Sequence, residues 1–201
     1  MGLSRKRINY ILLSVIEPMD PELAEHQMRT ADLALAIARE MGLDERRSGE
    51  VYTGALLHDI GRIFIPRAMN AKRATGKEAL AHIVRHPLDG YKLLVNTDLP
   101  REVKEIILRH HERLDGSGYP GGLRGSSIPR GARIVAVADF MDSMLTETGC
   151  PHTKDPYSRG DESGPREGRT PGRILRELIA GSGILYDSEA TAACLRLFKS
   201  P

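Results

Sequence analysis

The sequence predicts an all-α protein. Apolar residues recur at helical spacing through most of the 201 residues, and no alternating strand pattern extends beyond a few positions. Proline, glycine and capping residues mark where the periodic segments begin and end. The run RIVAVA could form a short buried strand, but it continues through DFMDSML at helical spacing, which favours a helix. A chain of this length falls within the usual size range of one domain.

The first long helix is predicted over residues 21–41. Asp20 can cap its N-terminus, Pro21 suits the first helical position, and Gly42 ends it. Its apolar stripe comprises Leu23, Ala31, Leu35, Ala38 and Met41. Upstream, RKRINYILLSVI has the outline of a secretion signal, but polar residues interrupt it and EPMDPE replaces a cleavage site. We therefore expect an opening core helix there.

Three further helices are predicted between residues 45 and 111: Glu45–Ile60, Glu78–Val95 and Pro100–His111. The middle one contains His86-Pro87, where we expect a kink or a restart because proline lacks an amide donor. The segment DGSGYPGGLRGSSIPRG follows and is too rich in glycine to be helical.

The last part of the chain is predicted to hold three helices and one long loop. ARIVAVADFMDSML has apolar side chains almost all the way round, which is typical of a buried helix. Residues 147–172 are polar and rich in Gly and Pro, so we expect a flexible loop or an insertion. RILRELIA and SEATAACLRLF, within residues 173–199, form the C-terminal helices.

The composition excludes several classes of protein. Lys and Arg number 29, Asp and Glu number 27, and aromatic residues make up only 4 %. A protein that coats DNA or RNA needs a basic face, and a single-strand binder needs stacking aromatics, so no nucleic-acid partner is expected. No stretch approaches the ~20 apolar residues of a membrane span, and no membrane partner is expected. Cys150 and Cys194 indicate free thiols in a reducing cytoplasm.

Histidines and carboxylates fall at helix ends or within apolar runs. Glu22 precedes His26 by four residues, which puts both on one face of a helix at metal-ligand spacing. The others are His58, Asp59, His86, His110, His111 and Asp139. Imidazoles and carboxylates without thiolates suit first-row metals such as Mn, Fe or Zn. We expect these residues to converge on one site and His82 and His152 to be solvated.

Each of these residues also has a plain alternative. Glu22 and His26 could form a surface contact, and His86 could be a polar helix-end residue before proline. Asp139 could pair with Arg133, since an unpaired buried carboxylate is costly. The combination favours a shared metal site over these separate explanations.

The motifs HDIG, HP, HHERLDGSGYPGGL and IPRGARIVAVADFMD resemble the HD-GYP subgroup of the HD superfamily of metal-dependent phosphohydrolases. The resemblance covers residues 22–144, and the HHE-to-GYP string is its most specific part. It implies one domain over residues 1–201, an HD-domain helical bundle with a GYP loop. It also implies two or three metal ions, often iron or manganese, and hydrolysis of the bacterial messenger cyclic di-GMP.

The resemblance assigns ligands residue by residue. Asp59 is the expected bridging ligand, and Glu22 matches a carboxylate associated with members that hold three metals. The full set it implies is Glu22, His26, His58, Asp59, His86, His110, His111 and Asp139. A metal-bound hydroxide would then attack the phosphodiester, and the metal charges would stabilise the leaving group.

Other expected roles are catalytic or concern substrate. Arg62 follows HDIG where many members carry Lys; it can clamp phosphate bidentately, or it can be a helix C-terminal cation facing the dipole. Asp115 and Tyr119 could contact substrate or a partner protein, although loop packing is the favoured alternative. The family's Asp-Arg-Pro-Tyr-Arg string is replaced here, with Thr148 where its first Arg would fall. Arg159, in KDPYSRG, could substitute.

The sequence therefore predicts a cytoplasmic phosphodiesterase that cleaves cyclic di-GMP to the linear dinucleotide, to GMP, or to both. One alternative is an HD phosphohydrolase acting on another nucleotide or cyclic dinucleotide, suggested by the missing arginine string. Another is a catalytically weak module that senses cyclic di-GMP or docks a signalling protein through the GYP loop. The complete ligand set favours the enzyme.

Overall fold

The computed structural model describes residues 13–65, 77–146 and 170–198. Most of the expected loop at 147–172 lies outside these ranges, as do Cys150, His152 and Arg159, and the burial of His82 is outside the description. Of the opening core helix, residues 13–16 are described and helical. No described helix is both long enough and apolar enough to cross a membrane.

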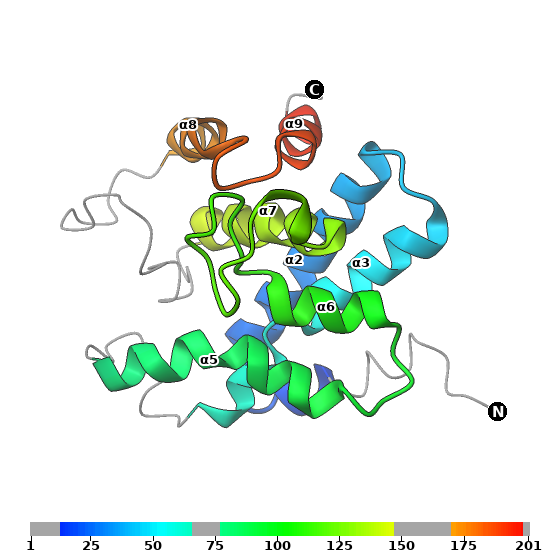
Figure 1. The fold of residues 1–201 in the computed structure, drawn as a ribbon, viewed down its shortest axis with the longest axis vertical. Helices are drawn as coiled ribbons and strands as arrows, with labels where there is room; N and C mark the ends of the chain where they lie inside the picture. The colour runs from blue at the N-terminus through cyan, green and yellow to red at the C-terminus, as the bar shows by residue number, and fades with distance from the viewer. Residues whose placement is uncertain (1–12, 66–76, 147–169, 199–201) are drawn as a thin grey trace.

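The described residues form helices and no strand, which confirms the all-α fold. The α-helices are α2 (Pro21–Glu40), α3 (Glu45–Leu57), α5 (Lys77–Leu94), α6 (Arg101–Arg109), α7 (Arg130–Leu145), α8 (Pro171–Gly181) and α9 (Ser188–Leu197). Two short 3-10 helices, η1 (Ile60–Phe64) and η2 (Gly125–Ser127), lie between them. Figure 1 shows α8 and α9 at one end of the molecule and α5 at the other, with α6 and α7 between them.

Local signals set several helix ends as predicted. The Asp20 side chain accepts a hydrogen bond from the amide of Leu23 at 3.0 Å, Pro21 opens α2, and Gly42 has a φ of 74° just beyond its end. The buried stripe of α2 is centred on small residues, so the expected Leu35 and Met41 are only half-buried. These small residues, Ala31, Ala34 and Ala38, let α3 and α7 pack closely against α2.

Two predicted boundaries are wrong. α3 ends at Leu57 rather than Ile60, and the chain tightens into η1. A Cβ at Gly61 would lie 2.0 Å from the carbonyl oxygen of His86, so the η1 backbone packs directly against α5. α5 runs through Pro87 as one helix, which excludes the restart, one of the two alternatives expected there. α6 likewise ends at Arg109, two residues before the predicted His111.

The hydrophobic core has two clusters of buried side chains. The larger one joins α2, α3, α6, α7, α8 and α9, and the smaller one joins the beginning of α2 with the end of α3, η1, α5 and α6. Neighbouring residues of α3 belong to different clusters, Leu56 to the larger and Leu57 to the smaller, and Ile106 and Ile107 of α6 divide in the same way. Both helices end within a few residues of these positions, so the residues that follow them lie where the clusters meet.

Candidate metal centre

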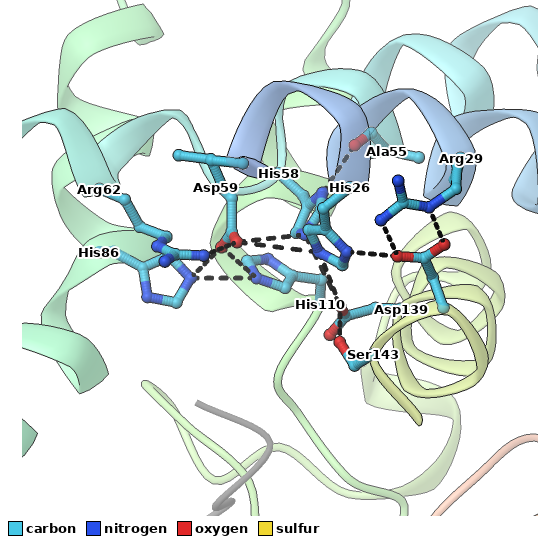
Figure 2. Close-up of polar contacts among 12 residues, drawn as sticks. His26, Arg29, Ala55, His58, Asp59, Arg62, His86, His110, Asp139 and Ser143 are labelled. Atoms are coloured by element: carbon cyan, nitrogen blue, oxygen red, sulfur yellow. Dashed lines mark hydrogen bonds and ion pairs between the residues drawn. The ribbon is translucent and has the colours of Figure 1, made fainter. Parts of the chain in front are cut away.

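Seven of the eight predicted ligands converge in the interior. Each is at most 9 % exposed, and they come from α2, the end of α3, α5, the end of α6, and α7. Figure 2 shows several of these side chains pointing toward one another between the helices. The seven residues are His26, His58, Asp59, His86, His110, His111 and Asp139.

Asp59 lies at the centre of the cluster. Its Oδ1 is 2.9 Å from Nε2 of His86 and 3.9 Å from Nε2 of His110. Its Oδ2 is 3.6 Å from Nε2 of His58 and 4.0 Å from Nε2 of His26. Each carboxylate oxygen therefore faces a different pair of imidazoles.

The ligand atoms form two groups that share Asp59. One group comprises Asp59, His86, His110 and His111, and the other comprises His26, His58 and Asp59, with the atoms of each group within 4.8 Å of one another. Asp139 adds a second carboxylate beside the latter group, since its Oδ1 is 3.2 Å from Nε2 of His26 and 3.8 Å from Nε2 of His58. This arrangement suits two neighbouring cations bridged by one carboxylate.

Three of the histidines are oriented by a backbone carbonyl three residues earlier in the chain. The Nδ1 atoms of His58, His86 and His110 lie 2.6, 2.6 and 2.9 Å from the carbonyl oxygens of Ala55, Ile83 and Ile107. A carbonyl only accepts hydrogen bonds, so each Nδ1 donates, and each Nε2 is the ring nitrogen left to face the cluster. Histidines that bind metals are commonly held in this way.

His26 is oriented by a carboxylate instead. Its Nδ1 lies 2.8 Å from Oδ2 of Asp142, and the guanidinium of Arg29 donates to both oxygens of that carboxylate at 2.7 and 3.2 Å. Sequence reasoning did not assign a role to Asp142 or Arg29. The available signal was their spacing: each follows a ligand, Asp139 or His26, by three residues on the same helix face.

The protonation states of the imidazoles differ between the two groups. Burial, together with repulsion from His58 and His86, lowers the pKa of His110 to about 3. Burial and the neighbouring histidines lower the pKa of His111 well below its usual range. Burial also lowers the pKa of His58. These imidazoles are neutral at neutral pH, which is the form that binds metals.

Carboxylates dominate the other end of the cluster. Although burial lowers the pKa of His26, hydrogen bonds to Asp139 and Asp142 outweigh it and raise the pKa to about 9. Burial alone would raise the pKa of Asp59 and Asp139, yet the nearby histidines hold both well below the ordinary carboxyl value. The carboxylates are therefore ionised, and a divalent cation beside His26 would replace its proton.

The donor set fits a divalent first-row metal. It combines neutral imidazole nitrogens with ionised carboxylates, contains no thiolate, and has its histidines already oriented. His86 is not a polar residue at a helix end, because it lies inside α5 and is 1 % exposed. The alternative partner of Asp139 does not pair with it either. Arg133 pairs with Asp187, the N-cap of α9, instead of with Asp139.

Glu22 and Arg62 differ in their positions. Glu22 is exposed one turn before the buried His26 and belongs to neither group of converging ligand atoms. Arg62 is only 5 % exposed, and its Nη1 donates to Oδ2 of Asp59 at 3.0 Å. The guanidinium is thus part of the cluster, although Arg62 also lies in the last turn of η1.

The GYP loop packs against the end of α6. Tyr119 is 6 % exposed; its ring stacks on His111 with 4.7 Å between centroids, and its amide donates to the carbonyl of His111 at 3.2 Å. Asp115 is exposed, and its Oδ1 accepts from the amide and the hydroxyl of Ser117 at 2.9 and 2.6 Å. Tyr119 therefore contacts a predicted ligand, and Asp115 forms a local turn.

Sequence reasoning also missed Glu112. This carboxylate is buried, and it accepts hydrogen bonds from the amides of Gly121 and Leu123 at 2.7 and 2.9 Å. The motif HHERLDGSGYPGGL contains all three residues, but nothing in it indicates that the chain folds back on Glu112. Glu112 holds the loop on α6.

The helical fold and the buried histidine–aspartate cluster define a helical protein with a candidate binuclear metal centre. Comparison with known families agrees: the HD domain model matches residues 11–154, and the chain belongs to the HD domain family.

Relatives in sequence carry phosphodiesterase names. The chain is 36 % identical over 189 residues to a cyclic di-GMP phosphodiesterase response regulator of Xanthomonas campestris pv. campestris, covering 92 % of this chain and 46 % of the relative. It is 36 % identical over 192 residues to a cyclic di-GMP phosphodiesterase of Thermotoga maritima, covering 94 % and 48 %. A 3'3'-cGAMP-specific phosphodiesterase 1 of Vibrio cholerae is 33 % identical over 138 residues, covering 68 % and 32 %. The chain thus spans about half the length of the first two.

Solved structures share the fold. An HDG"Y"P protein from Bdellovibrio bacteriovorus matches with a TM-score of 0.66 at 22 % identity, covering 98 % of this chain and 61 % of that one. The HD domain of the L. monocytogenes phosphodiesterase PgpH, in complex with cyclic-di-AMP, matches with a TM-score of 0.61 at 19 % identity, covering 93 % and 94 %. At these identities the likeness concerns the fold.

Proposed function

We propose that this protein is a metal-dependent phosphodiesterase that hydrolyses cyclic di-GMP to the linear dinucleotide, to GMP, or to both. The observation that carries the proposal is the pair of ligand groups sharing Asp59. The names of the Xanthomonas and Thermotoga relatives support the substrate. Two cations bridged by one carboxylate would suit attack on a phosphodiester, because one phosphate can span both.

The residues of the chain would have distinct roles in the proposed hydrolysis. Divalent ions, when bound, supply activation of the attacking water and neutralisation of the phosphate. Asp59 joins the two ion positions, and the oriented histidines fix the geometry around them. Arg62, held against Asp59 at 3.0 Å, would provide a guanidinium for the phosphate beside the metal ligands. Asp59 and Arg62 are thus the proposed catalytic residues.

We further propose iron or manganese as the native metal. Nitrogen and oxygen donors without sulfur suit both metals. The two described ligand groups would hold two ions, and Glu22, one turn before His26, would contribute to a third. The proposed site of action is the cytoplasm, which suits the free thiol of Cys194.

The GYP loop is the proposed contact for substrate or for a signalling partner. Asp115 is exposed on it and available to a partner, whereas Tyr119 faces His111. Arg159, outside the described residues, remains a predicted contact for the guanine nucleotide.

A second candidate substrate is another cyclic dinucleotide. The Vibrio cholerae relative is named for 3'3'-cGAMP, and the L. monocytogenes HD domain was solved with cyclic-di-AMP. This chain lacks the arginine string expected to hold guanine, so its sequence is compatible with a substrate other than cyclic di-GMP.

The test is a turnover assay with cyclic di-GMP, 3'3'-cGAMP and cyclic di-AMP, using anaerobically purified protein loaded with Fe²⁺ or Mn²⁺. We expect the highest kcat/KM for cyclic di-GMP, with metal bound at two or more ions per chain. Preference for one of the other dinucleotides would change the proposed substrate but leave the proposed phosphodiester hydrolysis unchanged. No hydrolysis of any of them by protein with two bound ions would refute the enzyme.

A further inference from the structure

Pro87 lies in the interior of α5, directly after the predicted ligand His86, and it is buried. Proline is the least favourable residue inside a helix, because it lacks the amide hydrogen that would bond to the carbonyl four residues earlier. For Pro87 that carbonyl belongs to Ile83. α5 continues past this point to Leu94, so the helix tolerates the missing bond.

The Ile83 carbonyl instead accepts the hydrogen bond from Nδ1 of His86, at 2.6 Å. Where His58 and His110 make the same contact, the accepting carbonyls of Ala55 and Ile107 lie in the last turn of α3 and α6. Carbonyls in the last turn of a helix lack the amide of a following turn, so they are available to a side chain. The Ala55 carbonyl accepts only a long backbone bond, 3.5 Å from the His58 amide. A carbonyl in mid-helix can accept a second bond, as that of Gly49 does from the Thr53 hydroxyl at 2.8 Å in α3. In the middle of α5, however, only a missing amide leaves a carbonyl to a side-chain donor alone.

We propose that Pro87 is a positioning residue for the metal centre. By withholding an amide donor, it leaves the Ile83 carbonyl to Nδ1 of His86. This fixes the proton on Nδ1 and directs Nε2 toward Asp59, whose Oδ1 it approaches at 2.9 Å. For His58 and His110, a carbonyl in the last turn of a helix accepts the hydrogen bond from Nδ1 in the same way. The inference rests on the metal centre of the proposed function.

The test compares the wild-type protein with Pro87→Ala and Pro87→Val. Both substitutions restore the amide donor, and valine keeps more of the buried volume of proline. Mn²⁺ binding to the full chain is followed by the electron paramagnetic resonance signal of the free ion. The imidazole signals of His86 in the metal-free protein are followed by long-range ¹H–¹⁵N spectra. Pro171→Ala is the matched control, because Pro171 opens α8, where no amide bond within the helix is lost.

We expect both Pro87 variants to weaken one of the two Mn²⁺ sites about ten- to a hundredfold, as is typical when the partner of a ligating histidine is lost. The other site keeps its Kd, and the His86 signals move in both variants. The Tm of the metal-free Pro87→Ala protein does not fall, because alanine is the better helix residue. Pro171→Ala leaves both Kd values unchanged.

Three results would overturn the inference. The first is an unchanged Mn²⁺ Kd and unchanged His86 signals in both variants. The second is a loss of affinity in Pro87→Ala that Pro87→Val does not share, which would assign the effect to packing of the ring. The third is a fall in the Tm of the metal-free protein with equal weakening of both sites. Fewer than two Mn²⁺ per wild-type chain would instead count against the proposed function.

Discussion

Asp59 presents a different carboxylate oxygen to each group of imidazole nitrogens. Oδ1 lies 2.9 Å from His86 and Oδ2 lies 3.6 Å from His58. Burial opposes the charge of the carboxylate, yet His58, His86 and Arg62 hold its pKa well below the usual value. The group is therefore ionised at neutral pH, as a bridging ligand must be.

Substituting Asp59→Ala should abolish hydrolysis of cyclic di-GMP and lower the metal content together. Both ligand groups lose the carboxylate that they share, so neither ion position remains complete. The measurements are kcat and metal per chain by elemental analysis. Asp98→Ala, at an exposed carboxylate, is the control and should change neither quantity. Normal turnover by Asp59→Ala would mean that the reaction takes place elsewhere.

Substituting Glu22→Ala tests the third ion. Glu22 lies one turn before His26 but outside the two converging groups, so only a third ion depends on it. We expect the loss of about one metal per chain, with the others retained. Glu25→Ala, on the same helix and ion-paired with Arg29 at 3.4 Å, is the control. An unchanged stoichiometry would remove the third ion from the proposal and leave the binuclear centre.

At the scale of helices, periodicity in the sequence predicts which segments are helical, whereas flanking residues predict only some of the helix ends. The positions of α2 and α7 follow from their own apolar patterns and flanking residues. The early end of α3 depends on η1 packing against α5 through Gly61, a contact with a segment far along the chain. α5 likewise continues through Pro87, which its own sequence pattern does not predict.

The sequence likewise predicts one part of the candidate site, the ligands, but not the residues that support them. The predicted ligands are recognisable because they fall in short motifs, and the structure brings together all of them except Glu22. Their supporting residues are not recognisable: Asp142 and Arg29 are 113 positions apart, and their contact exists only once α2 packs on α7. A motif gives the chemistry of a side chain, whereas its hydrogen-bond partner is decided by tertiary packing.

The contact between α6 and the GYP loop gives a prediction about stability. Substituting Glu112→Gln keeps one acceptor oxygen but turns an NH₂ group toward a second amide donor, since both Gly121 and Leu123 donate to this side chain. We expect the free energy of unfolding to fall by about 1–3 kcal/mol, measured by urea denaturation of the metal-free protein.

Glu105→Gln is the matched control for that variant. Arg109 approaches Glu112 at 3.4 Å and Glu105 at 3.8 Å, and the side chain of Glu105 is 25 % exposed. Loss of such a partly exposed ion pair should cost at most about 1 kcal/mol. If Glu112→Gln were no less stable than Glu105→Gln, the loop would not depend on the Glu112 carboxylate.

For the whole molecule, a formal charge of +2 conceals a strongly uneven distribution. Three ionised carboxylates, those of Asp59, Asp139 and Asp142, gather in the interior, while Arg62 and Arg29 each neutralise one of them in part. Without metal, burial lowers the pKa of His26 but hydrogen bonds to Asp139 and Asp142 raise it to about 9, so His26 contributes a proton there. Divalent ions would make the same interior positive, so near-neutrality of the chain is compatible with a phosphate substrate.

This distribution predicts that metal stabilises the whole fold. An ion that binds only the folded chain contributes about 2.7 kcal/mol when its free concentration is 100 times Kd. For a protein of this size, about 2.7 kcal/mol raises the Tm by roughly 5–11 °C per ion. Circular dichroism melts of chelated protein and of protein at fixed free Mn²⁺ concentrations measure the shift, which should grow with the logarithm of the concentration. Asp59→Ala should show almost no shift, whereas Asp98→Ala should show all of it, because only the former lacks the shared ligand. Equal shifts in the two variants would mean that Mn²⁺ stabilises the protein through some other part of its surface.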